Sequence, residues 1–475
     1  MSLSESLSEH ATLEEINGML LTGDRHNELR RELSAMLSAP SLLEQCDVRH
    51  ARFRPGHKLR ANFDARLRSE SNGQPCVRAM EVTWRPQRDK DKRPKGAEDL
   101  GKMQEEAKRR GVAAPFHQLM ADLPSLGLQL RVSPLDAQFP QLVRMSDPEY
   151  VGEMVARVSG EGHAVHVNPG TGRYAVKCIR YRPGRRHVLR YDSLDAPECG
   201  TIFAKMYADQ KGERAFRVAN TVADWLAQYG KGVTSLRPLA YLPEDSVVLY
   251  RRILGQSLTQ YLQSPGDGVG QSLRAVGVAL RALHELPEGL IGPLKLHDLA
   301  AEVKQIKRSG EHLPALLPSA GAAVKAMLDR AMELDGILPR EQPTFTHGDF
   351  ISEHIWVTAA GLVLIDFDNC FLADPALDIG KFLADLHLVY ATHNLPGVEE
   401  AQEAFLAGYG ISTNPERLTR SRLYEAIKLA KMAARRVYVF EHDWADRTTH
   451  LIARAQSLMN DFERKLGLPP GQLPA

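Results

Sequence analysis

Hydrophobic and polar positions follow two different periods along this chain, and the change from one to the other divides it. Residues 12–45 place apolar positions at helical spacing among charged ones, which predicts a short helical entry segment. Residues 173–252 contain short apolar runs separated by turn residues, which predict strands, one helix and two further strands. Beyond Gly255 the helical period dominates, except for a hairpin within residues 349–368. The pattern therefore predicts an α+β fold, with a small β-rich lobe followed by a larger helical lobe.

A short pattern occurs twice, at residues 52–64 and again at 180–192. Both segments begin with Arg-aromatic-Arg-Pro-Gly, both end in an aromatic residue and aspartate, and both predict strand, Pro-Gly turn, strand. The strand after the second copy carries Lys205, whereas its counterpart has no lysine and offers Arg78 and Glu81. The repeat is either a duplication whose first copy serves as a scaffold, or a chance recurrence of a turn motif.

Composition excludes several classes of function. The chain has 475 residues, of which 43% are hydrophobic and 25% charged, and its formal charge of +1 provides no bulk field for nucleic acid or membrane lipid. The five cysteines show no metal-ligand spacing, and the N-terminus lacks a signal-peptide pattern. We expect a cytoplasmic protein with reduced thiols and with no nucleic-acid or membrane partner.

The densest chemistry lies in the segment FTHGDFISEHIWVTAAGLVLIDFDN, which brings two histidines and three aspartates together. Asp349 follows an apolar run at a strand-to-loop corner, where a carboxylate would orient or deprotonate an acceptor hydroxyl in phosphoryl transfer. The hairpin between the two strands returns Asp366 beside residue 354, and Asp366 and Asp368 supply the oxygen ligands that Mg²⁺ prefers. His347 is predicted to be a buried hydrogen-bonding support.

His354 stands where a kinase usually places asparagine, and imidazole suits manganese, zinc or iron better than magnesium. It either changes the metal preference, binds phosphate or water, or only satisfies local hydrogen bonds. Asp378, at the start of the next predicted helix, is expected to cap backbone amides near the catalytic corner.

Lys205 lies in an apolar strand, where a buried ammonium needs an anion such as a nucleotide phosphate. Glu213 at the start of the next helix is its first candidate partner and Asp224 the second. The alternative is an edge lysine that reaches solvent. The sequence offers weaker candidates for nucleotide binding: Arg185 and Arg186 in the second Pro-Gly turn, which is otherwise a plain exposed turn, and Arg252 and Ile253 at the end of the small lobe.

These motifs resemble the aminoglycoside phosphotransferase and choline kinase-like superfamily, whose fold is similar to that of protein kinases. The resemblance rests on His347-Gly348-Asp349 with a metal position five residues later, on IDFD at 365–368 and on DPALD at 374–378. It covers about residues 173–475. It implies Asp349 as catalytic base, Asp366 as a magnesium ligand, Lys205 on the phosphates with Glu213 as its partner, ATP or GTP as donor, and a small-molecule hydroxyl as acceptor.

The resulting prediction is a small-molecule kinase that uses Mg²⁺, with Mn²⁺ as the alternative ion. The acceptor is a sugar, an amino alcohol or an antibiotic-like molecule, although the arginine pair at 435–436 in the charge-balanced tail disfavours a polycationic aminoglycoside, and a neutral polyol or anionic metabolite fits at least as well. Two alternatives stay open: a catalytically weak nucleotide-binding regulator, and a metallohydrolase built on the aspartate and histidine cluster. The predicted domains are a helical entry segment (1–45), an N-terminal domain read as a degenerate small-lobe copy (46–165), a nucleotide-binding small lobe (166–252) and a catalytic helical lobe (253–475).

Overall fold

The chain forms two compact units. The computed structural model describes residues 3–38, 41–69, 75–86, 97–160, 172–195, 200–209, 211–264, 268–410, 414–435, 438 and 440–468. The first unit comprises Met1–Phe216, Pro238–Arg252 and Val437–Trp444, and the second comprises Arg217–Arg237, Ile253–Arg436 and Ala445–Ala475.

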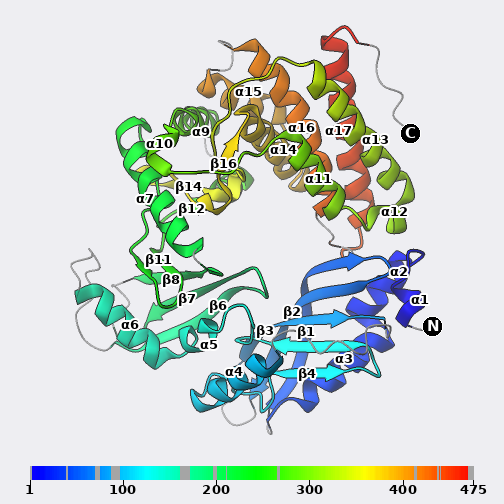
Figure 1. The fold of residues 1–475 in the computed structure, drawn as a ribbon, viewed down its shortest axis with the longest axis vertical. Helices are drawn as coiled ribbons and strands as arrows, with labels where there is room; N and C mark the ends of the chain where they lie inside the picture. The colour runs from blue at the N-terminus through cyan, green and yellow to red at the C-terminus, as the bar shows by residue number, and fades with distance from the viewer. Residues whose placement is uncertain are drawn as a thin grey trace. The chain divides into compact units, whose positions relative to one another are not determined.

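Two five-stranded antiparallel sheets form the framework of the first unit (Figure 1). The first sheet has the order β1-β2-β3-β5-β4, and the second has the order β6-β7-β8-β11-β10. The strands of the first sheet are β1 (Ser41–Arg54), β2 (Lys58–Ser69), β3 (Pro75–Trp84), β4 (Met120–Leu123) and β5 (Leu128–Val132). Those of the second are β6 (Tyr174–Arg182), β7 (Arg186–Ser193), β8 (Thr201–Met206), β10 (Ala240–Leu242) and β11 (Val247–Arg251).

The two sheets repeat one topology. In each, three strands follow one another, a helix comes next, and the fifth strand then inserts between the third and the fourth; the helices are α4 (Ala97–Arg109) and α7 (Lys211–Tyr229). The hairpin turns also match, because Gly56 has φ 71° and Gly184 has φ 70°, a left-handed conformation that glycine adopts readily. This agreement favours duplication over a chance recurrence of the turn motif.

The pairing register shows what occupies the lysine position in the first sheet. Lys205 on β8 pairs with Val188, the fourth residue after the turn glycine Gly184. In the first sheet the fourth residue after Gly56 is Arg60, and its β3 partner is Thr83. A buried threonine therefore replaces the lysine, and the first sheet lacks the cation proposed to bind phosphate.

The helical entry segment is shorter than predicted. It consists of α1 (Leu3–Ser6), α2 (Leu13–Asn17), a π-helical turn (Gly18–Thr22) and α3 (Asp24–Ala35). The extension to residue 45 is wrong because β1 begins at Ser41, and Leu43 pairs with Leu67 of β2. A short apolar run such as SLLEQC fits a strand as well as the end of a helix, and pairing with β2 decides between them.

Two helices assigned to the N-terminal domain pack with the second sheet. They are α5 (Gln141–Met145) and α6 (Pro148–Gly160). Their apolar side chains share one buried core with β6, β7, β8, β10 and β11, in which Met154 lies with Tyr191 and Leu249. The second sheet is therefore covered by residues that precede the predicted boundary at 165.

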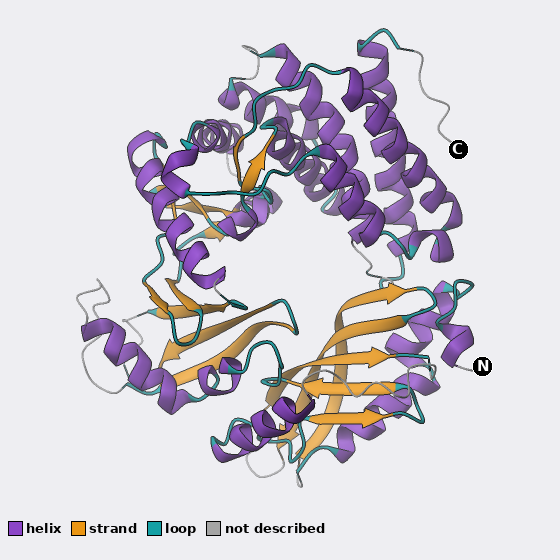
Figure 2. Cartoon of the chain, in the orientation of Figure 1, coloured by secondary structure: helices purple, strands orange, loops and turns teal. Residues whose placement is uncertain are grey.

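The second unit is mostly helical, with a few short strands, as Figure 2 shows. Besides the part of α7 from Arg217 onward, its helices are α8 (Leu258–Gln263), α9 (Val269–His284), α10 (Glu288–Ile291), α11 (Leu299–Ser309), α12 (Leu313–Leu316), α13 (Pro318–Ile337), α14 (Ala376–Thr392), α15 (Val398–Tyr409), α16 (Pro415–Arg435) and α17 (Trp444–Lys465). Strands β12 (Gln256–Ser257), β14 (Ile355–Thr358), β15 (Gly361–Leu364) and β9 (Val233–Ser235) form one sheet in that order, and β13 (Thr344–Thr346) pairs with β16 (Phe371–Ala373).

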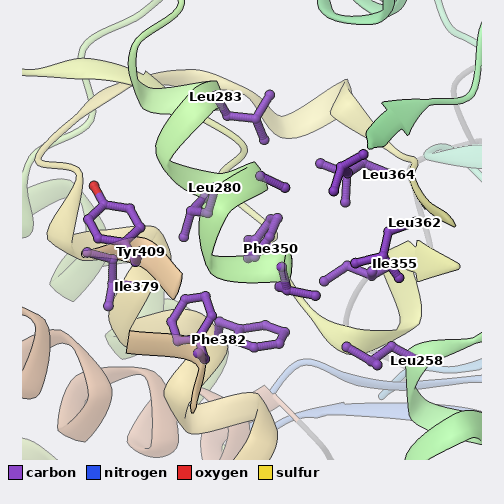
Figure 3. Packing of buried hydrophobic residues seen from close by; sticks show 14 of the residues in the cluster. Leu258, Leu280, Leu283, Phe350, Ile355, Leu362, Leu364, Ile379, Phe382 and Tyr409 are labelled. Carbon is purple, nitrogen blue, oxygen red and sulfur yellow. The ribbon is translucent and has the colours of Figure 1, made fainter. Parts of the chain in front are cut away.

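A buried apolar core joins the β14–β15 hairpin to helices α9 and α14 (Figure 3). Phe350, Ile355 and Leu364 pack there with Leu280 of α9 and Phe382 of α14. Burying side chains of this size contributes roughly 1.5–3 kcal/mol each. The core thereby fixes the backbone of the hairpin, whose polar ends carry the residues singled out in the sequence.

The predicted α+β class is confirmed, as is the order of a β-rich small lobe and a larger helical lobe, with an additional N-terminal sheet domain. None of the helices in the described parts of the chain combines the length and apolarity needed to cross a lipid bilayer.

Candidate functional site

The segment His347-Gly348-Asp349, which we call the catalytic corner after its predicted role, follows the last residue of β13. Asp378 in the first turn of α14 holds this corner, because its carboxylate accepts hydrogen bonds from the backbone N–H of His347 (2.6 Å) and of Gly348 (3.0 Å). Gly348 has φ 74°, and a Cβ there would lie 2.3 Å from the carbonyl oxygen of Asn369. Only glycine fits this bend, so the chain turns sharply and presents Asp349.

His347 is fully buried and supports the site through hydrogen bonds. Its Nε2–H donates to the carbonyl oxygen of Ile365 (3.0 Å), and its Nδ1 accepts from the backbone N–H of Asp349 (3.3 Å). Burial, followed by the charge of His354, lowers the pKa of His347, which favours this neutral tautomer. The ring therefore links the two strand ends of the site and has no free nitrogen for acid–base work.

Asp349 presents a carboxylate that is 30% exposed, and Lys381 of α14 lies beside it, with 3.5 Å between Nζ and Oδ1. Burial raises the pKa of Asp349, but the charge of Lys381 and then those of the two histidines outweigh burial and hold the pKa below its usual value. The side chain is ionised at neutral pH and accessible from one side, as a residue that orients a hydroxyl must be.

His354 and Asp366 face each other across the hairpin. His354 ends a 3₁₀ turn (Ser352–His354), and its Nδ1–H donates to the backbone oxygen of Asp349 at 2.8 Å. In the neutral ring this bond leaves the Nε2 lone pair free of a proton, and Nε2 lies 3.4 Å from Oδ2 of Asp366. The geometry places one nitrogen and one oxygen donor side by side.

Asp366 has a left-handed backbone, with φ 68° and ψ 56°. This conformation is uncommon for residues other than glycine, and such strain persists only where the surroundings impose it, frequently at functional sites. Asp366 lies between the end of β15 and a second 3₁₀ turn (Phe367–Asn369), and the bend directs its carboxylate toward His354.

The three metal ligands predicted from the sequence do not form a closed set. Among the described residues, no group of three or more His, Cys, Asp or Glu side chains could by itself hold a metal ion. His354 and Asp366 are adjacent, whereas Asp368 lies half-buried on the following 3₁₀ turn. A metal ion that bridges nucleotide phosphates needs only one or two protein ligands, so the pair fits that role. A metallohydrolase, which needs three, has no support from the described residues.

Lys205 lies on β8 in the first unit, and its Nζ is 5.7 Å from the centre of the Tyr207 ring. Glu213 is exposed in the first turn of α7. Asp224, the second candidate partner, forms an ion pair with Arg237. The pairing of Lys205 with Glu213 stays a prediction.

Asp136, which precedes the second sheet in the sequence, holds the second Pro-Gly turn in place. Asp136 accepts hydrogen bonds from the backbone N–H of Gly184 (2.7 Å) and from Nε2–H of the buried His187 (2.8 Å). Arg185 lies exposed in the turn, and Arg186 begins β7. The structure thus fixes the turn backbone and leaves the Arg185 side chain at the surface.

The end of the small lobe coincides with the boundary between the two units. The backbone N–H of Arg252 donates to the carbonyl oxygen of Thr201 (3.0 Å), and Ile253 is the next residue, half-buried.

Sequence reasoning missed the lysines of α14 and α16. Lys381 contacts Asp349, and Lys428 and Lys431 are buried on α16. A signal was present, because each lysine stands within a helical run that is otherwise mainly apolar, ALDIGKFLADL and AIKLAKMAA. A helix that is apolar on all sides is buried, and a lysine inside it needs an anion.

A family model described as the phosphotransferase enzyme family matches residues 169–428. The match spans more than half of the chain, and the chain belongs to this family. No curated protein sequence matches it significantly.

Solved structures to which this chain is similar include three kinases of low sequence identity. A choline/ethanolamine kinase family protein from Mesorhizobium loti is 20% identical, with a TM-score of 0.42, over 65% of this chain and 98% of that one. A choline kinase from Cryptosporidium parvum is 13% identical, with a TM-score of 0.47, over 67% and 98%. The GDP complex of an aminoglycoside 2'-phosphotransferase-IIIa is 13% identical, with a TM-score of 0.42, over 64% and 98%.

Proposed function

We propose that this protein is a small-molecule kinase, which moves the γ-phosphate of ATP or GTP to a hydroxyl group of a small molecule. The observation that supports it most is the catalytic corner: a partly exposed, ionised Asp349 on a glycine-dependent bend, with the His354–Asp366 pair on the neighbouring hairpin. Membership of the phosphotransferase enzyme family gives the reaction class.

In this proposal each residue has one task. Asp349 accepts the hydrogen bond of the acceptor hydroxyl and takes its proton as the new O–P bond forms, while the bond from the γ-phosphorus to the β–γ bridging oxygen breaks and nucleoside diphosphate leaves. His347 and Asp378 keep the corner in place through the hydrogen bonds described above. Lys205 binds nucleotide phosphates, with Arg185, Arg186 and Glu213 in supporting roles and with the backbone at Arg252 and Ile253 toward the base.

A divalent cation would be held by Asp366 and His354, with Asp368 near the same hairpin end. When bound, the ion neutralises charge on the nucleotide phosphates. The Asp366 oxygen suits Mg²⁺, while the imidazole favours Mn²⁺ over Mg²⁺. The two donors fit a metal that completes its coordination with phosphate oxygens and water.

The test of this function is acceptor-dependent release of nucleoside diphosphate. The purified full chain is incubated with ATP or GTP, with Mg²⁺ or Mn²⁺, and with sugars, sugar acids, amino alcohols and aminoglycosides, and the phosphorylated product is identified by mass spectrometry. Nucleotide binding is measured separately by calorimetry. Binding without transfer to any acceptor supports a nucleotide-binding regulator instead. That alternative is motivated by His354 in the usual asparagine position and by the N-terminal residues, which precede the family match at 169–428.

Replacing His354 by asparagine should move the metal preference from Mn²⁺ toward Mg²⁺. The imidazole nitrogen is replaced by a hard amide oxygen, and we expect Mn²⁺ affinity to fall about 10–100-fold, as for other losses in a metal's ligand shell. Electron paramagnetic resonance titration of Mn²⁺ in the presence of nucleotide measures the affinity directly, and the ratio of Mn²⁺- to Mg²⁺-supported turnover gives a second readout. Unchanged values of both would remove His354 from the metal site and leave it a purely structural residue.

A further inference from the structure

Helix α14 contacts the catalytic corner through two of its side chains. Asp378 accepts the backbone hydrogen bonds of the corner, and Lys381, three residues later, places its Nζ 3.5 Å from Oδ1 of Asp349. Residues three apart lie on the same side of a helix, so both side chains reach the corner from one face of α14. The backbone of the corner and the carboxylate of Asp349 are thus held by the same helix.

The ammonium group of Lys381 is buried and has Asp349 as its ion-pair partner. Its side chain is 11% exposed, and α14 is buried along most of its length. Asp385, one turn further on, also attracts the ammonium group, but its Oδ2 already accepts hydrogen bonds from the backbone N–H and the hydroxyl of Ser352. A buried cation that loses its ion-pair partner is strongly unfavourable, so the charge of Lys381 depends on an anion at the position of Asp349.

The proposed reaction removes the charge of Asp349. As the acceptor oxygen bonds to the γ-phosphorus, its proton moves to the Asp349 carboxylate, the bond to the β–γ bridging oxygen breaks, and nucleoside diphosphate leaves with the electrons of that bond. Asp349 is then a neutral carboxylic acid, whereas Lys381 keeps its proton and its charge. The ion pair of the resting site is therefore lost during the reaction.

The reaction also places a new anion beside Lys381. The transferred phosphoryl group is bonded to the oxygen that gave up its proton, and that oxygen lies within hydrogen-bond distance of Asp349. Because Lys381 Nζ is 3.5 Å from the same carboxylate, the phosphoryl oxygens are within its reach. Negative charge is spread over these oxygens in the transition state, and a cation positioned beforehand stabilises it.

We propose that Lys381 is a catalytic residue, which pairs with Asp349 before the reaction and with the transferred phosphoryl group from the transition state onward. The proposal rests on the proposed kinase function and deepens it, because it assigns the group that neutralises the phosphoryl oxygens next to the base. One ammonium group thereby keeps Asp349 ionised for proton transfer and binds the phosphoryl group once the proton has moved.

A binding experiment tests this exchange of partners without a known acceptor. Calorimetry measures the affinity of the full chain for ADP or GDP with Mg²⁺, with and without aluminium fluoride, an anionic mimic of the phosphoryl group in flight. Asp349→Asn reproduces the neutral residue that proton transfer creates. We expect the fluoride to tighten nucleotide binding at least about tenfold more in this variant than in wild type, the effect of one hydrogen bond from a charged group.

The double variant Asp349→Asn/Lys381→Met separates the two causes of such a gain. If Lys381 binds the mimic, the gain disappears in the double variant. A gain that persists would come from relief of repulsion by Asp349 and would overturn the proposal, as would an equal fluoride effect in Asp349→Asn and wild type. Binding of the nucleotide alone shows that each variant is folded. The control Lys325→Met replaces an exposed lysine of α13 and should leave the fluoride effect unchanged.

Turnover gives a second readout that does not need the Asp349→Asn variant. With the best acceptor of the phosphoryl-transfer assay, Lys381→Met should lower kcat by about 10²–10³-fold, as for removal of one group that stabilises transition-state charge. Lys381→Arg keeps the charge and should recover most of this loss. A purely structural role predicts the opposite order, because methionine fits the space of a buried lysine better than arginine does.

The role of Lys381 and the kinase function fail separately. Phosphoryl transfer with a kcat of Lys381→Met at about a third or more of the wild-type value refutes the role of Lys381 and keeps the kinase. Transfer to no acceptor refutes the kinase, while a fluoride gain that disappears with Lys381 keeps this lysine as the residue that binds the phosphoryl group.

Discussion

Replacing Asp349 by asparagine should reduce turnover by about 10²–10⁴-fold, the usual contribution of a positioned acid–base group. The amide keeps the shape of the side chain but cannot take the acceptor's proton. The backbone of the catalytic corner is held by Asp378 and His347 and does not depend on the Asp349 carboxylate. The loss should therefore appear in kcat, with the nucleotide dissociation constant near its wild-type value.

The matched control for this variant is Glu353→Gln, which removes a carboxylate from the exposed surface of the adjacent 3₁₀ turn. We expect it to retain turnover within a few-fold of wild type, because surface charges away from the reacting atoms act weakly. Steady-state kinetics on the best acceptor measure kcat, calorimetry measures nucleotide binding, and thermal unfolding shows whether each variant is folded. An Asp349→Asn enzyme that keeps a tenth or more of wild-type kcat would contradict the role of base.

The order of elements was predictable because hydrophobic period reports directly on secondary structure. The runs that predicted helices after Gly255 became α8, α9 and α13, and the hairpin became β14 and β15. The extent of the entry segment was not predictable, because residues 41–45 become a strand only through pairing with β2. The repeated turn motif could not by itself establish duplication, since the order of five strands appears only in the folded sheets.

The candidate site was predictable where its residues are close in the sequence, and not where they are far apart. His347, Asp349, His354 and Asp366 lie on one short hairpin segment, so their spacing in the sequence fixes their neighbourhood in space. Lys381 follows in the next helix. Lys428 and Lys431 reach their acid partner Glu302 from more than a hundred residues away along the chain, through the packing of α11 against α16. Ion pairs between residues so far apart leave no pattern in the local sequence. The presence of lysines within otherwise apolar helices was the signal that they need acidic partners.

Glu302→Gln should destabilise the second unit by about 3–5 kcal/mol, the usual effect of removing one partner of a buried ion pair. Glu302 is almost fully buried and accepts hydrogen bonds from both Lys428 and Lys431. Among the described residues, its loss leaves the buried Lys428 without a carboxylate partner and Lys431 with only neutral amides, including that of Gln305. The free energy of unfolding, measured by urea denaturation of the full chain, reports the effect. The control Glu333→Gln removes an exposed surface charge and should change that value by less than about 0.5 kcal/mol.

The pH dependence of the difference in unfolding free energy between wild type and Glu302→Gln distinguishes a charge effect from a packing effect. Burial raises the pKa of Glu302, but Lys428, His297 and Lys431 outweigh burial and hold the pKa far below its ordinary value of 4.5. A depressed folded-state pKa means that the stabilisation is complete above the unfolded-state pKa and is lost as pH falls through the folded-state pKa. The advantage of wild type over Glu302→Gln should thus be full at pH 7 and should shrink progressively below about pH 4.5.

Adding Lys428→Met to Glu302→Gln should restore part of the stability, because one uncompensated charge is removed with its partner. A deficit that is constant with pH and not relieved by Lys428→Met would show that Glu302 stabilises the unit by packing and not by charge.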